Sequence, residues 1–349
     1  MHSSARGYMC AQACIYLAMI MMARHGGRVF GPTTITALAK PEIPAEARPD
    51  TYHPKDSQDD FDVWGLTARQ VQAVAGHAGL SGHYEVFPYT NASRIVSERV
   101  LDAYVSSGFP VILFLDMARL HETEQESHAA VSERGQRGKR PTDHAVVVVG
   151  GSNLGDPGLD IPTIVIHDTA KKPYMEFSWP QVFEACAAFG RGRRQPGDVP
   201  KVGFVAYCPH NVKVSSFSAW RAAMKDPRLD FSVPLWRIRL VEGARLSARY
   251  FSEVLLWSTM PGAVHAGPPD YVAGELAGGL FWVIEQFSYE ADRRRRRPSF
   301  VLGYDAASPD APERPSFVLK VEDGCIVTLE VADRGAMTWM AHVGDVTTW

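Results

Sequence analysis

Three residues far apart in the sequence have the side chains and local settings of a thiol nucleophile and its partners. Cys10 opens the apolar segment CAQACIYLAMIMMA, which predicts a buried helix ending at Gly26 and Gly27. His144 begins the apolar strand pattern HAVVVVGG, and Asp168 ends the strand pattern TIVIHD. Only a thiolate attacks a carbonyl group, and both the positive end of a helix dipole and a nearby imidazolium lower the pKa of a cysteine. The three residues therefore favour nucleophilic thiol chemistry.

The two strands can bring the histidine and the aspartate together. If they run antiparallel, adjacent strands lie about 4.8 Å apart, so the head of one and the tail of the other are neighbours. The Asp168 carboxylate would then orient the His144 ring and fix its tautomer. His167 points to the opposite face of a regular strand, and we expect a structural role for it.

Cys14 is the alternative nucleophile. It lies four residues after Cys10, so the two side chains share one helix face at about 6 Å. Only Cys10 is at the helix start, where unpaired N–H groups stabilise a thiolate, whereas burial inside an apolar helix raises a thiol pKa. We therefore expect Cys10 to attack and Cys14 to be a core residue. The other cysteines are expected in the core as well: Cys186, Cys208 and Cys325.

The elements that must hold these residues are helices packed on an antiparallel sheet. Residues 28–64 are interpreted as a loop, and the charged insert 119–142 as a mobile surface loop directly before His144. Thr67 is a candidate helix cap and Gly79 a helix stop. Helices are expected within 10–25, 65–80, 94–108 and 246–257, and strands within 84–89, 109–117, 144–151, 163–168, 203–208, 233–242, 279–290, 298–306 and 316–331. Residues 171–190 are expected to form a strand followed by a helix.

This order of elements predicts an α+β protein of two domains. Residues 1–210 can close one compact α+β unit, with a boundary near Pro209. Residues 211–349 are interpreted as a smaller α+β domain, an antiparallel sheet with a helix, whose last two predicted strands form a hairpin turning on Asp323 and Gly324. Because that second part holds no ordered set of Cys, His and carboxylate, we expect it to recognise the substrate or a partner.

The first 210 residues or so resemble a family, the papain-like bacteriocin-processing peptidases that cleave double-glycine leaders. The likeness lies in the segments YMCAQACIYLAMIMMARHG, GLTARQVQAVAGHAGL, SSGFPVILFLD, DHAVVVVGG and VIHDTAKKPYMEFSW, which follow the family's order. The resemblance implies a papain-like fold, a bacterial protein, Cys10 as nucleophile, His144 as general base and acid, and Asp168 as orienting carboxylate. No transporter sequence follows, so leader-peptide export is not implied.

Two positions depart from that family. Ala11 stands where members carry glycine, and Ser4 stands where they carry the glutamine that completes the oxyanion hole. Losing one such donor typically costs roughly 100-fold to 1000-fold in rate. Ser4, Gln12 or a backbone group would substitute, or the natural chain begins before Met1, or the enzyme is weakened.

Three functions remain open at this point. The first is a hydrolase, a cysteine peptidase that cleaves or deconjugates a protein or peptide through a thioester acyl-enzyme. The second is a papain-like acyltransferase or deamidase with the same thiol chemistry. The third is a catalytically inactive papain-like binding module. A reactive thiol of low pKa would argue against the third, and product analysis with an added amine would separate the first two.

Composition excludes several other classes of protein. The 349 residues are 46% hydrophobic and 21% charged with a net charge of −3, typical of a globular protein and not of a nucleic-acid binder. The five cysteines are odd in number and scattered, which favours a reducing cytoplasm. The longest apolar stretch, Ala11–Ala23, is shorter than the roughly 20 residues of a membrane span, so no membrane is expected.

No cofactor and no metal are predicted. The segment His121–His128 lacks the spacing of a zinc-binding helix, and the glycines from Gly150 lack the order that cradles a dinucleotide. The arginine run Arg293–Arg297 has no interleaved aromatic residues of the kind that stack bases, and it is interpreted as a solvated turn or the contact for an acidic partner.

Overall fold

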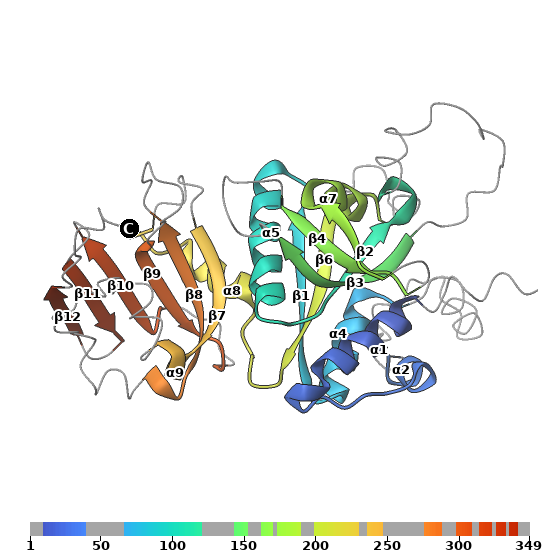
Figure 1. Ribbon diagram of the computed structural model, residues 1–349, viewed down its shortest axis with the longest axis horizontal. Helices are drawn as coiled ribbons and strands as arrows, with labels where there is room; N and C mark the ends of the chain where they lie inside the picture. Colours follow the sequence, from blue (N-terminus) through green and yellow to red (C-terminus); the bar gives the residue numbers. More distant parts are fainter. Residues whose placement is uncertain are drawn as a thin grey trace, which may run out of the picture. The chain divides into compact units, whose positions relative to one another are not determined.

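The computed structural model divides into two compact units. One holds Met1–Leu154 and Asp160–His210, and the other holds Gly155–Leu159 and Asn211–Trp349 (Figure 1). Each unit contains an antiparallel sheet and helices, which confirms the prediction of an α+β protein. The structure describes residues 10–39, 66–120, 143–152, 162–169, 173–189, 199–229, 236–246, 276–287, 298–308, 314–322, 326–332 and 335–340.

The first unit is built on a six-stranded sheet in the order β1-β6-β2-β3-β4-β5. Every pairing in it is antiparallel, and β3 lies between β2 and β4. The strands are β1 (Leu80–Pro88), β2 (Val111–Asp116), β3 (Asp143–Ser152), β4 (Thr163–His167), β5 (Met175–Ser178) and β6 (Lys201–Pro209).

Two groups of helices cover the two faces of this sheet. In Figure 1, α1, α2 and α4 gather on one face, while α5 and α7 lie on the other. Their bounds are α1 (Cys10–Met22), followed by the short 3-10 helix η1 (Ala23–His25), then α2 (Pro32–Ala39), α4 (Ala68–His77), α5 (Asn91–Ser106) and α7 (Trp179–Ala188).

The buried helix expected at the start of the chain is α1. Cys14, Ile15, Ala18 and Met19 are fully buried, so this helix is part of the core rather than a surface element. The chain continues as η1, which ends where expected, because its C-cap Gly26 has φ 82°, a left-handed conformation that glycine adopts without a steric penalty.

Helix α4 begins and ends at residues that the sequence singles out. The Thr67 hydroxyl accepts from the Gln70 N–H, while the Gln70 side chain accepts from the Thr67 N–H, which is a complete capping box. Gly79 follows with φ 74°. The capping box supplies hydrogen bonds to N–H groups that have no partner within the helix at its first turn.

Helix α2 corrects the expectation of a loop at the start of residues 28–64. Pro32 occupies the first position of α2, where its missing N–H costs nothing. Ile35 and Ala39, four residues apart, are fully buried on one face. The helix is too short for an apolar period to stand out against the Thr-rich sequence around it. The charged insert predicted as a loop from Arg119 begins with two residues that are still helical, Arg119 and Leu120. Residues 40–65 and 121–142, the rest of both predicted loops, lie outside the described part.

The second unit contains another six-stranded antiparallel sheet, whose strands follow one another in sequence. The expected sheet was smaller; the described one equals the first in strand number, and β12 was not predicted. The elements are α8 (Ser216–Ala223), β7 (Trp236–Glu242), α9 (Gly243–Arg245), β8 (Leu280–Phe287), β9 (Pro298–Asp305), β10 (Phe317–Glu322), β11 (Ile326–Val331) and β12 (Gly335–Met340).

Aromatic contacts hold α8 against this second sheet. Trp220 of α8 stacks on Trp236 of β7 with ring centroids 5.7 Å apart, and the buried Trp282 indole donates to the Val214 carbonyl at 2.7 Å. Several expectations fall outside the described residues: the hairpin turn at Asp323 and Gly324, most of the helix at 246–257, Cys325 and Arg293–Arg297.

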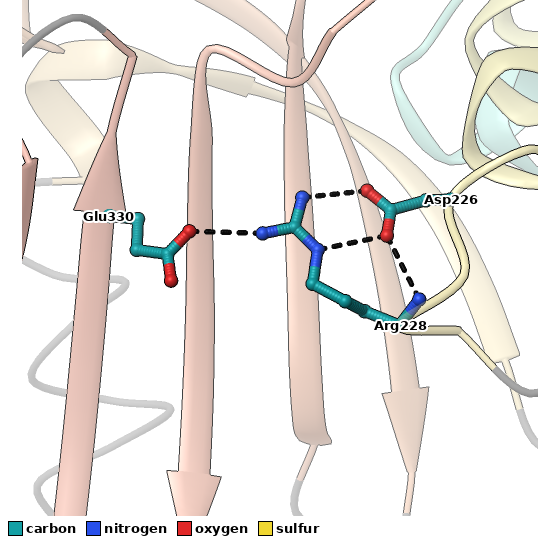
Figure 2. A network of polar contacts seen from close by, with 3 residues as sticks. All are labelled: Asp226, Arg228 and Glu330. Atoms are coloured by element: carbon teal, nitrogen blue, oxygen red, sulfur yellow. Dashed lines mark hydrogen bonds and ion pairs between the residues drawn. The ribbon is translucent and has the colours of Figure 1, made fainter.

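A polar network fastens the segment after α8 to β11 (Figure 2). The Arg228 guanidinium donates to both carboxylate oxygens of Asp226, at 2.8 and 2.7 Å, and to Glu330 at 3.0 Å. The hydrogen bonds from Arg228 hold the pKa of Asp226 below its ordinary value. This network joins the turn at Asp226 and Arg228 to β11 of the same sheet.

Candidate active site

The site begins with Cys10 at the start of α1. The thiol is half-buried, and α1 packs against β3, the strand that carries His144. The first N–H groups of a helix have no partner within it, so they are free to bind a negative charge. The Cys10 sulfur accepts a hydrogen bond from one of them, the N–H of Ala11, and a second from the backbone N–H of Ala145.

His144 and Asp168 meet across β3 and β4. The strands run antiparallel with Val147 opposite His167, so Asp168 follows the end of β4 on the same face as His144. The His144 Nε2 donates to Asp168 Oδ1 at 2.9 Å. The carboxylate is fully buried and the imidazole is 12% exposed, so neither group is well solvated. This hydrogen bond fixes the ring and leaves the other ring nitrogen for Cys10.

The Cys10 side chain hydrogen-bonds to the His144 ring, which joins the three residues in one chain. Burial by itself would raise the pKa of Cys10, but the hydrogen bond and positive charge of His144, with the N–H groups of Ala145 and Ala11, bring that pKa below its ordinary value. Burial likewise disfavours the imidazolium, yet Asp168 and Cys10 raise the pKa of His144 to about 9. The arrangement favours a thiolate beside an imidazolium near neutral pH.

Cys14 occupies a different environment. It is fully buried, and its thiol donates to the carbonyl oxygen of Ala145 at 3.2 Å. Burial raises the pKa of Cys14 well above its ordinary value, and the negative charges of Cys10 and Asp168 raise it further. These conditions keep Cys14 protonated and disfavour it as the nucleophile. Cys186 and Cys208 are also buried, as expected for core residues.

Gln12, a candidate oxyanion donor, contacts another element. Its side-chain amide donates to the Thr36 hydroxyl of α2 at 3.4 Å. Cys10, two residues before it, contacts His144 of β3, and positions two apart on a helix do not face the same side. Ser4 lies outside the described residues. The backbone N–H groups of Ala11 in α1 and Ala145 in β3 are donors that the structure places beside the thiol.

The part that Ala145 plays could not be predicted from the sequence. Its N–H and its carbonyl both bind cysteine sulfur, but an alanine carries no side-chain signal for such a contact. His167 packs edge-on against Tyr174, with ring centroids 5.9 Å apart, in keeping with the structural role expected for it. Within the described ranges, no group of three or more His, Cys, Asp or Glu residues could hold a metal ion, and no helix is long and apolar enough to cross a membrane.

No family model matches the sequence, and neither does any curated protein. Several solved structures are similar, and three of them are the following. The peptidase domain of Streptococcus ComA, a bifunctional ABC transporter of a quorum-sensing pathway, is 13% identical with a TM-score of 0.28 over 58% of this chain and 92% of that domain. A C39-like peptidase from Bacillus anthracis is 13% identical with a TM-score of 0.30, over 57% of this chain and 88% of its own. The Pseudomonas avirulence protein AvrPphB is 12% identical with a TM-score of 0.28, over 57% and 90%. Likenesses this distant assign no activity to the chain.

Proposed function

We propose that the first unit is a cysteine peptidase that cleaves or deconjugates a protein or peptide through a thioester acyl-enzyme. The observation that carries this proposal is the hydrogen-bonded chain Cys10–His144–Asp168, in which the pKa of the thiol is lowered and that of the imidazole is raised to about 9. A thiol nucleophile, a general acid and base, and an orienting carboxylate are the three groups that acyl transfer by cysteine requires.

In the proposed reaction, the Cys10 thiolate attacks the carbonyl carbon of the scissile amide. The C–N bond then breaks as the imidazolium of His144 gives its proton to the departing amine, which leaves a thioester. The now neutral His144 then removes a proton from a water molecule, which attacks the thioester carbonyl. The C–S bond breaks, the acid product leaves, and the Cys10 thiolate and the His144 imidazolium are formed again. Asp168 stays ionised throughout and holds the ring in the productive tautomer.

Backbone groups supply the oxyanion donors in this proposal. Negative charge develops on the carbonyl oxygen next to the Cys10 sulfur, close to the unpaired N–H groups of the first turn of α1. Backbone donors of this kind need no glutamine side chain, so the departure at Ser4 is compatible with turnover. The lowered pKa of Cys10 argues against the inactive binding module, because a purely structural cysteine in the same place would not need it.

We also propose that the second unit recognises the substrate or a partner. In the described part of that unit several acidic and basic side chains form ion pairs, such as Arg228 with Asp226, and Glu285 is buried and paired with Arg237 and Arg239. These are contacts that order a fold, not groups prepared to exchange protons. The chemistry is therefore assigned to the first unit alone.

The test is product analysis with a peptide library. The full chain is incubated with peptides derived from a whole proteome, in water enriched in oxygen-18, and new termini are identified by mass spectrometry. We expect new N-termini whose partner C-termini carry oxygen-18, since water resolves the thioester. The inactive variant is Cys10→Ala, and the matched control is Cys186→Ala in α7, a buried cysteine away from the site. New termini that persist in Cys10→Ala would contradict the assignment.

The same experiment separates hydrolysis from the alternative chemistries. An added amine would appear as an amide in the products of an acyltransferase, at the expense of the oxygen-18 label. A deamidase would leave the peptide chain intact and convert a glutamine or asparagine side chain to the acid. A dominant product of either kind would replace the peptidase assignment while leaving Cys10 as the nucleophile.

A further inference from the structure

The backbone of Ala145, directly after His144, is bound by two sulfur atoms from one helix. The Cys10 sulfur accepts from the Ala145 N–H, and the Cys14 thiol donates to the Ala145 carbonyl oxygen at 3.2 Å. Because Cys10 and Cys14 are four residues apart on α1, both project from the same helix face. Together they fasten the start of α1 to β3 at the residue next to the imidazole.

The sheet explains why these backbone groups are available. β4 ends at His167, whose partner on β3 is Val147, so the register provides no β4 residue opposite Ala145. In an antiparallel ladder the N–H and C=O of one residue point toward the same neighbouring strand. With both groups bound to α1 sulfurs, Ala145 directs them to the side where β4 has ended. Without Cys14, the Ala145 carbonyl would lose the hydrogen bond that α1 supplies to it.

The protonation state of Cys14 suits a donor. The side chain is fully buried, and burial together with the neighbouring negative charges keeps the sulfur as a neutral thiol. A thiolate has no hydrogen to donate, whereas the thiol can bind a carbonyl oxygen. The two cysteines thus have opposite parts: Cys10 accepts as a thiolate, and Cys14 donates as a thiol.

We propose that Cys14 is a positioning residue for the Cys10–His144 pair: its hydrogen bond to Ala145 sets the distance at which α1 presents the Cys10 sulfur to the Ala145 N–H and to the imidazole. This inference rests on the proposed function, because it concerns the ionisation of Cys10, the proposed nucleophile. Without the Cys14 donor, the start of α1 is free to move from β3, and the two contacts that stabilise the thiolate weaken together.

The experiment measures the pH dependence of Cys10 alkylation in the full chain. Iodoacetamide labelling of Cys10 is followed by mass spectrometry in the wild type, Cys14→Ala and Cys14→Ser. We expect Cys14→Ala to raise the midpoint by about 0.5 to 1 pH unit, a three- to tenfold smaller thiolate fraction below the midpoint. Cys14→Ser keeps a hydroxyl donor, so its Cys10 midpoint should stay close to that of the wild type. An unchanged midpoint in Cys14→Ala would overturn the proposal.

The matched control is Cys186→Ala in α7, another buried cysteine of the first unit. This substitution removes a buried sulfur from the core, so it should lower the melting temperature without changing the Cys10 midpoint. A purely structural role for Cys14 predicts that Cys14→Ala behaves in the same way as this control.

A second pair of variants keeps the proposal testable if Cys14→Ala fails to fold. Cys14→Thr and Cys14→Val are nearly equal in size, but only threonine can donate to Ala145. A lower midpoint in Cys14→Thr than in Cys14→Val supports the positioning role, and equal midpoints reject it. The wild-type value separates the two proposals: a low midpoint that no Cys14 variant changes rejects only the positioning role, whereas a wild-type midpoint at the ordinary cysteine value rejects the thiolate–imidazolium pair itself.

Discussion

At the scale of single residues, the site changes the proton affinities of two groups. An isolated imidazole loses its proton more readily than a thiol, but here the pKa of Cys10 is lowered and that of His144 is raised to about 9. The raised pKa of His144 contributes stability that is complete below its ordinary value of 6.5 and is lost as the pH rises through about 9. Cys10 contributes stability that is present above its ordinary value of 9.0 and lost as the pH falls through its lowered pKa.

The three residues should differ in what their removal costs. Cys10→Ala and His144→Ala should each lower turnover by about 10⁶-fold, because nucleophile and base act as one unit. Asp168→Ala should lower it by about 10⁴-fold and leave a measurable rate, since the carboxylate only orients the ring. The measurement is the rate of cleavage of a peptide found with the library. Full activity of His144→Ala would show that the assignment is wrong.

Turnover should fall on the basic side near pH 9, where the His144 imidazolium loses the proton that the departing amine needs. The check is a profile of kcat/KM against pH. In Asp168→Ala the basic limb should move to lower pH, because the hydrogen bond from His144 to Asp168 is the largest contribution that raises this pKa. A limb at the same pH in both proteins would contradict the role assigned to Asp168.

At the scale of elements, α4 packs directly on β1, on the face of the sheet that also carries α1. Gly82 of β1 lies directly under α4, where an added Cβ would come within 2.6 Å of the Gln72 carbonyl oxygen. The Gln72 side chain also donates to the Gly82 carbonyl at 2.9 Å. At Gly82 the backbone of α4 therefore lies against the backbone of β1. Only glycine allows this close approach.

Gly82→Ala should therefore destabilise the first unit by about 1 to 3 kcal/mol, because α4 must move away from β1. Gly76→Ala within α4 is the matched control, since nothing lies within 4 Å of its Cβ position. There alanine should stabilise by up to about 1 kcal/mol through its higher helix propensity. Chemical denaturation measures both. Equal effects of the two substitutions would contradict the close packing of α4 on β1.

At the scale of the whole molecule, the unit boundary follows the sheet. β6 ends at Pro209 and lies between β1 and β2, so the first sheet is complete only when the chain reaches that residue. His210 still belongs to this unit, because its carbonyl accepts from the Ser81 hydroxyl at 3.2 Å. Asn211 begins the second unit, whose own sheet is paired strand by strand from β7 to β12.

A chain ending at Asn211 should keep the low-pH labelling of Cys10 and lose selectivity among peptides, because all three site residues and their sheet precede that point. The measurement is iodoacetamide labelling against pH together with the range of library peptides cleaved. The control is the same shortened chain with Cys10→Ala. Loss of labelling in a shortened chain that is still folded would contradict the division of roles.

Much of this arrangement could be predicted from local sequence. The helix at Cys10 followed from an apolar run closed by Gly26 and Gly27, and the strands of His144 and Asp168 followed from apolar patterns. The cap at Thr67 could be predicted in the same way, because a hydroxyl residue before an apolar period is a local signal. Each of these signals lies within a few residues of the feature that it predicts.

Contacts between segments far apart in the chain were decided only by the tertiary structure. The pairing of β6 between β1 and β2 was not predictable, since no local pattern states which strands become neighbours. The hydrogen bond from the Gln12 amide to Thr36 of α2 joins two helices, and no local pattern predicts it. Ala145 carries no polar side chain, so its part emerges only where β4 ends before β3 and leaves two backbone groups for the sulfurs of Cys10 and Cys14. Residue type determined which groups could react, and the long-range register of the sheet determined which of them meet.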